Sequence, residues 1–217
     1  MKKALTLLAL SLSIMVSAQD KIAEGIVISK QKMTTDSEQL KAQLESMGEM
    51  ETTTYFKDYK SRSELSNPMS GDVTSITDSK AKKTLMLMDN PMLGKKYMLQ
   101  TAENIDETLK DVEVIEGDET KTILGYDCKQ YLVNVTKDGI EMKMELFTTD
   151  AILAEVQQTA MLGEKLKGFP LYMTITMNQM GSEMVITTEV VDIKKQSVAD
   201  EMFNMTPPEG YEKMPGQ

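Results

Sequence analysis

A hairpin in the second half of the chain shows the clearest alternation of apolar and polar positions. Asp138-Gly139 is a two-residue signal of the kind that closes β-hairpins. If Lys137 pairs with Ile140, apolar residues meet on one face. These pairs are Tyr131 with Leu146, Val133 with Met144, and Val135 with Met142. A slip of one residue would mix apolar and polar positions on both faces, so the pattern fixes the register.

A second hairpin is predicted from Pro170 to Ile193, around a loop at Asn178–Glu183. With a symmetric loop its inward pairs are Leu171 with Val190, Met173 with Thr188, Ile175 with Ile186, and Met177 with Met184. The other face then carries threonines and Glu189, so this hairpin also has one apolar face.

The first half of the chain predicts one helix among strands. Ile22 to Met33 has strand character, and Thr35 with Glu38 fits a capping box. Apolar residues then follow at helical spacing, which predicts an amphipathic helix from Asp36 to about Met50. Further strands are expected at residues 52–64, 72–77, 84–88, 96–101 and 111–115, with breaks at 67–71 and 90–94. Short helices are expected at residues 103–110, 150–162 and 198–203.

Consecutive hairpins with one apolar face predict an α+β fold in which β-structure dominates. The sheet should be curved and antiparallel, forming a half-open barrel, with two or three short helices covering it. Residues 19–217 should form a single domain. In a regular strand, Tyr126 and Cys128 would point to one face of the sheet, whereas Tyr131 and Val133 would point to the other. If both sets face the core, a bulge must lie near Lys129–Gln130.

The first residues predict a secretory signal peptide. Lys2 and Lys3 precede an apolar run from Leu5 to Val16, and Val16-Ser17-Ala18 suits signal peptidase, so cleavage is expected after Ala18. The run is shorter than the ~20 residues that span a bilayer, and no transmembrane segment is expected elsewhere. The expected localisation is therefore the periplasm, either free or at the outer membrane.

Composition excludes several classes of function. The chain has no His and one Cys, so no histidine general base, imidazole metal site or intramolecular disulfide is available. The sequence has 24 basic and 34 acidic residues, and its charge of 24 − 34 = −10 disfavours nucleic acid as a partner. We expect no cofactor, no metal and no enzymatic activity.

Methionine is the unusual component, with 20 residues. Because Met is flexible and polarisable, it suits a core, but it also suits a cavity for apolar ligands of variable shape. A third interpretation is Cu(I) binding by thioethers, at Met47–Met50, Met142–Met144 and Met177–Met180. The candidate cavity lining comprises Met86, Met88, Val133, Val135, Met142, Met144, Leu146, Leu171, Met173, Ile175, Met177, Met184 and Ile186.

Three other features have an ordinary and a functional interpretation. The acidic residues between Asp111 and Glu119 suit a solvated edge strand better than a Ca²⁺ site or an acid/base pair. Arg62 is the only arginine, and is either a surface charge or a group that orients a helix or a ligand carboxylate. Cys128 is either a small buried apolar residue or a thiol that pairs between chains.

One stretch resembles the central motif of a secreted family of Bacteroidota, domain of unknown function 4412: Ile123-Leu124-Gly125-Tyr126-Asp127-Cys128-Lys129-Gln130-Tyr131. Two further stretches match, Gly168-Phe169-Pro170-Leu171 and Phe203 with Pro207-Pro208-Glu209-Gly210-Tyr211. The resemblance spans most of residues 22–212. The family is similar in fold to the LolA-like lipoprotein carriers, which have a half-open barrel, helices in its mouth and a cavity for acyl chains. Those carriers use an arginine near the early strands to set the closure of the barrel, which suggests a gating role for Arg62.

The resemblance implies a periplasmic lipid or lipoprotein handler. The leading hypothesis is a non-enzymatic protein that binds an apolar small molecule or a lipoprotein acyl chain inside an open barrel. The alternative is an envelope sensor or interaction module with a filled core and a protein partner. Cu(I) binding through methionine is the third hypothesis.

Overall fold

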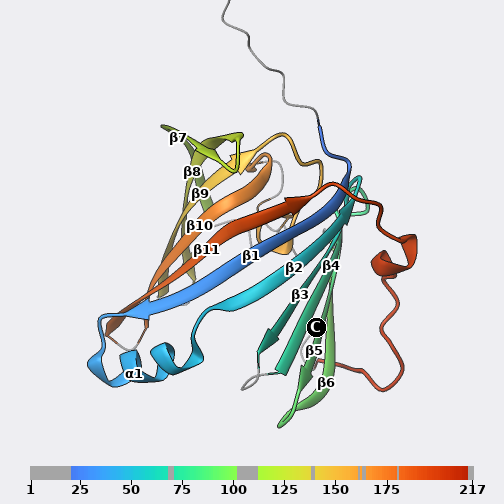
Figure 1. Cartoon of the computed structure of the whole chain (residues 1–217). Coiled ribbons are helices and arrows are strands. Elements are labelled where there is room, and N and C mark those ends of the chain that lie inside the picture. The colour runs from blue at the N-terminus through green and yellow to red at the C-terminus, as the bar shows by residue number, and fades with distance from the viewer. Residues whose placement is uncertain are drawn as a thin grey trace, which may run out of the picture.

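One large, curved antiparallel sheet accounts for most of the described residues (Figure 1). The computed structural model describes residues 21–67, 71–101, 112–137, 140–160, 162, 165–179 and 181–214. The predicted signal peptide at 1–18, the predicted helix at 103–110 and the Asp138-Gly139 turn lie outside these ranges.

The sheet consists of two meanders joined by the first strand. The first meander contains β2 (Met50–Lys57), β3 (Lys60–Asn67), β4 (Gly71–Asp78), β5 (Lys83–Asn90) and β6 (Gly94–Thr101). The second contains β7 (Val112–Ile123), β8 (Tyr126–Lys137), β9 (Ile140–Thr149), β10 (Phe169–Gln179) and β11 (Ser182–Lys194). The long strand β1 (Glu24–Thr35) pairs with both β2 and β11. A two-residue strand, β12 (Glu212–Lys213), runs parallel to β6, so β12 and β7 are the edges of the described sheet.

The predicted hairpin registers are confirmed. Lys137 pairs with Ile140, and the three apolar pairs between β8 and β9 follow in the predicted order. Between β10 and β11, Met177 pairs with Met184, Ile175 with Ile186, and Met173 with Thr188. Leu171 and Val190 lie beyond the last of these pairs and are both in the core. The predicted strand at 52–64 is instead the β2–β3 hairpin, which turns at Asp58, a residue with φ of 52°.

The predicted capping box is wrong. The helix α1 (Glu38–Met47) begins after Ser37, and no side chain caps its N-terminus. Thr35 is instead the last residue of β1, and its hydroxyl group donates a hydrogen bond to the carbonyl oxygen of Glu183 in β11 (2.8 Å). Thr35, which the sequence pattern assigns to the start of the helix, therefore belongs to β1 and pairs with β11.

Two or three helices covering the sheet are not confirmed by the described residues. α1 buries none of its residues, and α3 (Gln157–Ala160) is a single turn where a helix from 150 to 162 was expected. The third element is a 3₁₀ turn, η3 (Asp200–Phe203). Within the described ranges, no helix has the length and apolar character needed to cross a bilayer.

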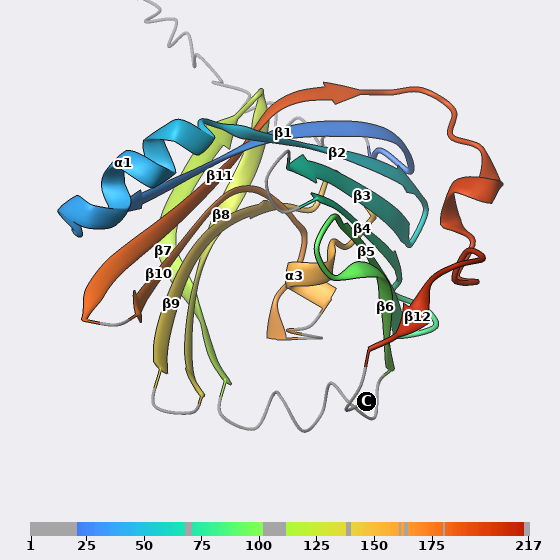
Figure 2. The same ribbon diagram turned by 90° about the horizontal axis from the view of Figure 1, so that it is seen from below.

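Irregular segments cover the two faces of the sheet. On the concave face lies α3 with its flanking residues, whereas the chain after β11 runs along the convex face (Figure 2). On the convex side, Val198 and Phe203 pack against Ile76, Leu85 and Leu87. The protein thus has one core inside the curve of the sheet and another outside it.

The predicted bulge is in the neighbouring strand. β8 pairs with β9 without interruption, and the register shift lies in β7 between Glu116 and Thr120. Gln130 fills the bulge, since a Cβ atom at Gly117 would lie 2.1 Å from its Oε1. β8 needs no bulge of its own because Cys128 and Tyr131 serve different core clusters.

Candidate functional site

The concave face of the sheet is uncharged over most of its width. Residues directly opposite one another on neighbouring strands point to the same face. The pairs of Met173 with Thr188, Thr188 with Gln31, and Gln31 with Met50 therefore place all four residues on the concave face. Applied strand by strand, this rule gives only uncharged residues at the concave positions of β1–β5 and β9–β11. Charged residues make up 27% of the sequence, so they are concentrated elsewhere.

One side of this face is an apolar wall, formed by the concave side chains of β8–β11. All the predicted lining residues of these four strands lie on it. Val133, Leu146 and Leu171 are fully buried, and Met144 and Met173 are nearly so. The remaining residues are half-buried: Val135, Met142, Ile175, Met177, Met184 and Ile186.

Met86 and Met88 lie on the same face but not on this wall. They belong to β5, which β1–β4 separate from β11. Met86 pairs with Ser75, and Met88 pairs with Val73, so their neighbours differ from those of the β8–β11 methionines. The predicted lining set therefore falls into two separate groups.

The other side is a hydroxyl wall, which sequence reasoning missed. It comprises eight concave residues of β1–β5: Ser29, Thr52, Thr54, Ser61, Ser63, Ser75, Thr77 and Thr84. Six of these side chains are buried, all except Thr52 and Ser63. The signal was present in the sequence, because Ser or Thr recurs at every second position in 52–54, 61–63 and 75–77.

An inner segment, residues 151–168, crosses the concave face between the two walls (described except for 161, 163 and 164). Its Leu162 and Leu166 pack against the core of the apolar wall. Its other end reaches the hydroxyl wall, where Ser61 donates a hydrogen bond to the carbonyl oxygen of Glu155. The backbone N–H of Ile22 holds the start of the segment by donating to the carbonyl oxygen of Ala151 (2.6 Å).

A small cavity lies where the two walls meet beneath the inner segment. Its volume is about 70 Å³. Polar residues of β1–β3 line one side of it, namely Ser29, Gln31, Thr52, Thr54 and Ser63. Val156 of the inner segment, together with Leu171 and Met173, lines the apolar side. The cavity is therefore polar on one side and apolar on the other.

Glu155 brings a titratable group into the inner segment. Its side chain is partly buried, and desolvation raises the pKa of its carboxyl group above the ordinary value. Burial favours the neutral form of a carboxylic acid because the charged form loses its hydration. The segment is thus held against the sheet less well when Glu155 is charged.

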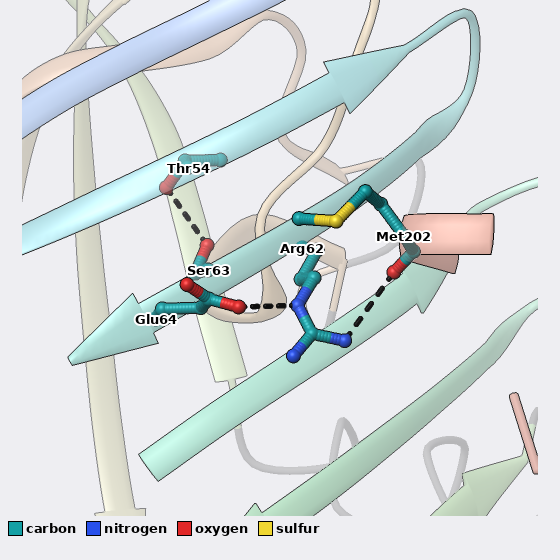
Figure 3. A network of polar contacts seen from close by, with 5 residues as sticks. All are labelled: Thr54, Arg62, Ser63, Glu64 and Met202. Carbon is teal, nitrogen blue, oxygen red and sulfur yellow. Dashed lines mark hydrogen bonds and ion pairs between the residues drawn. The ribbon is translucent and has the colours of Figure 1, made fainter. Parts of the chain in front are cut away.

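Arg62 lies on the convex face, away from both walls. Its Nε bonds to Glu64 (2.5 Å), and its Nη1 donates to the carbonyl oxygen of Met202 in η3 (3.4 Å) (Figure 3). Neighbouring Ser63 points the other way and shares a hydrogen bond with Thr54 (2.8 Å). Arg62 therefore contacts the C-terminal segment on the opposite face of the sheet from the inner segment, and its suggested gating role stays a prediction.

A wider cleft of about 600 Å³ lies near the β7–β8 turn. Four lysines and three acidic residues line it, so its charges nearly balance. Cys128 lies behind it with only 1% of its surface exposed, and burial raises the pKa of its thiol to about 11. No group of three or more acidic or Cys side chains in the described ranges is arranged to hold a metal ion.

Comparisons with solved structures give weak likenesses. The chain is 15% identical to PNGF-II, with a TM-score of 0.49. The match covers 89% of this chain but only 31% of the PNGF-II chain. It is 6% identical to the Mycobacterium tuberculosis lipoprotein LppX, with a TM-score of 0.31, over 81% of this chain and 89% of LppX. A comparison with curated proteins found no match.

A family model gives the firm assignment. The model for a domain of unknown function, DUF4412, matches residues 37–211, which include nearly all of the described sheet. The three stretches that resemble this family all lie within the match. The chain belongs to the DUF4412 family.

Proposed function

We propose that this protein is an exported, non-enzymatic binder of apolar ligands. In this proposal the curved sheet acts as a half-open barrel in the periplasm, and its concave face shields the acyl chain of a lipid or a lipoprotein from water. Shielding is worth about 0.8 kcal/mol for each buried CH₂ group, before the cost of opening the cavity.

The observation that carries the proposal is the incomplete covering of the apolar wall. Met177, Met184 and Ile186 are half-buried, although they lie on the inner face of a curved sheet. Leu162 and Leu166 of the inner segment pack against deeper residues of the same wall. Flexible thioether side chains at such positions suit ligands of variable shape.

The inner segment would act as the gate. Ligand pockets usually measure about 300–1,000 Å³, whereas the cavity beneath the segment measures about 70 Å³. An acyl chain therefore has to displace Val156 and Leu162 or slide between them and the wall. Polar contacts at Ser61 and Ile22 that could break and re-form would make binding reversible.

The test is a titration of the protein with fatty acids of increasing chain length in competition with a fluorescent acyl probe. Each added CH₂ should tighten binding by up to about fourfold, because about 0.8 kcal/mol corresponds to that factor. Met184→Asp should abolish uptake, since it places a charge on the concave face.

Val185→Asp is the matched control, because Val185 is also half-buried but lies on the convex face. It should leave uptake intact while circular dichroism shows both variants folded. If chain length has no effect on affinity, or if both variants lose uptake equally, the proposal fails. A filled-core module that binds a protein partner would then be the better hypothesis.

Copper is a second candidate, favoured by one row of the sheet. Met142, Met177 and Met184 are direct neighbours across β9, β10 and β11. Thioether ligands suit Cu(I), and three of them in one row would supply a soft site. A chelator-buffered Cu(I) titration should then show saturable binding that Met177→Leu removes, and its absence would eliminate this candidate.

A further inference from the structure

The serines and threonines of the hydroxyl wall are direct cross-strand neighbours and form a continuous patch. Thr54 pairs with Ser63, and Ser63 pairs with Ser75. The next row pairs Ser61 with Thr77, and Thr77 with Thr84. Buried polar groups are costly unless they are hydrogen-bonded, and in the described ranges no hydroxyl group of this wall is a buried atom without a partner.

Several hydroxyl groups of the wall bond to one another, and that of Ser61 bonds to the inner segment. Thr54 and Ser63 bond to each other (2.8 Å), as do Thr77 and Thr84 (3.3 Å). Within the described ranges, the hydroxyl groups of Ser29, Thr52 and Ser75 are not among the buried atoms that lack a partner, so each reaches either solvent or a partner. These groups can both donate to a ligand and accept from it.

Gln100 adds an acceptor at the same wall. It pairs with Thr84, which places its side chain on the concave face. Its Oε1 is the one buried side-chain oxygen or nitrogen in the described ranges that has no hydrogen-bond partner. A buried acceptor without a partner favours any bound group that brings an O–H or N–H donor.

The charges around the wall disfavour an ionic ligand. No concave position of β1–β5 is charged, and Lys96 in the adjoining strand β6 is already paired with Glu212 (2.6 Å). Glu155 of the inner segment lies beside this wall, since its backbone carbonyl oxygen accepts from Ser61, and its charged form would repel an anion. A phosphate or carboxylate bound here would lose its hydration without gaining a counter-charge.

We infer that the ligand is an amphiphile with an uncharged, hydrogen-bonding head group. The head group lies against the hydroxyl wall, and the acyl chain lies along the apolar wall. The cavity of about 70 Å³ at the junction, lined by both walls, marks where the two parts of the ligand join. This inference rests on the proposed function and specifies the ligand of the same site.

The test compares three ligands with the same acyl chain: a monoacylglycerol, the free fatty acid and a lysophosphatidylglycerol. Each competes with the fluorescent acyl probe for binding to the exported protein at pH 7.5. The monoacylglycerol should bind at least tenfold more tightly than either anion. Ser63→Ala should reduce this preference, and Ser63→Lys should reverse it by supplying a counter-charge.

Thr53→Ala and Thr74→Ala serve as controls, because both threonines are half-buried on the convex face next to the wall. They should leave the preference unchanged. If the three ligands bind equally, or the anions bind more tightly, the inference is overturned while the proposed function stands. If none of the three binds, the proposed function falls, and the inference falls with it.

Discussion

Burial separates the methionines of the apolar wall into two groups. Met144 and Met173 are in the core beneath the inner segment, with 8% and 6% of their surface exposed. Met142, Met177 and Met184 are half-buried. An aspartate at Met144 or Met173 would place a charge in the core, so such variants report on folding. The half-buried group is the one that can report on ligand uptake.

The two groups should therefore differ in their effect on stability. Met144→Ala should lower the free energy of unfolding by about 2–5 kcal/mol, because it leaves a cavity in a packed core. Met184→Ala should lower it by less than about 1 kcal/mol, since its side chain is already partly solvated. Urea denaturation measures both values. Equal costs would mean that the whole wall is core and that no ligand surface remains.

Cys128 should behave as a small apolar residue. With a pKa of about 11, only about 0.1% of its thiol would be ionised at pH 8, and the thiolate is the reactive form. Maleimide labelling at pH 8 should therefore be far slower in the native protein than in guanidinium chloride. No disulfide-linked dimer should form under oxidising conditions. Equal labelling rates in both states would show that the thiol is accessible through the neighbouring cleft.

The β7–β8 turn has a leucine at a position where the backbone conformation favours other residue types. The turn consists of Leu124 and Gly125 between the paired residues Ile123 and Tyr126. Both turn residues have positive φ, 51° and 82°. A two-residue turn of this kind favours Asn-Gly, and leucine is strained in the left-handed region.

Leu124→Asn should therefore stabilise the protein by about 0.5–1 kcal/mol in urea denaturation. Gly125→Ala is the opposite control. It should destabilise the protein by about 1 kcal/mol, because only the positive φ opposes the added Cβ, which meets no atom within 4 Å. A loss of stability in Leu124→Asn would mean that the exposed leucine makes contacts that outweigh its backbone strain.

The inner segment should respond to pH through Glu155. Folding raises the pKa of this carboxyl group, so its charged form opposes the folded arrangement. The stabilising contribution is complete below the unfolded pKa and is lost as pH rises through the folded pKa. Hydrogen exchange in residues 151–160, corrected for intrinsic rates, should therefore be slower at pH 4.5 than at pH 7.5.

Glu155→Gln keeps the shape of the side chain but cannot ionise. Exchange in this variant should be slow at both pH values, which separates Glu155 from the other carboxyl groups that titrate in this range. If the difference between the two pH values persists in the variant, another group controls the segment.

Alternation predicted the hairpins because it is local, whereas the failures involve partners far away in the sequence. The pairs from Val135–Met142 to Met173–Thr188 follow from a period of two. The helix expected at 150–162 forms only one turn, because the backbone of this stretch bonds to Ile22 and Ser61 and Leu162 packs on the sheet. No sequence pattern reports such contacts.

At the scale of the whole molecule, the interior has two chemically different walls. The sequence indicated the apolar wall through methionine, but it gave no reason to combine the serines and threonines of five strands. Their grouping depends on β1, which brings the two meanders together by pairing with both β2 and β11. The position of Arg62 on the convex face was equally out of reach, since alternation does not say which face of a curved sheet is concave.

We expect the exported protein to carry a lipid with an uncharged head group in this interior. Native mass spectrometry of the exported protein, compared with the same sample denatured, tests it most directly. We expect a native mass that exceeds the denatured mass by that of a neutral lipid, and we expect a monoacylglycerol to restore the adduct after delipidation. Identical native and denatured masses, both before and after incubation with the monoacylglycerol, would contradict it.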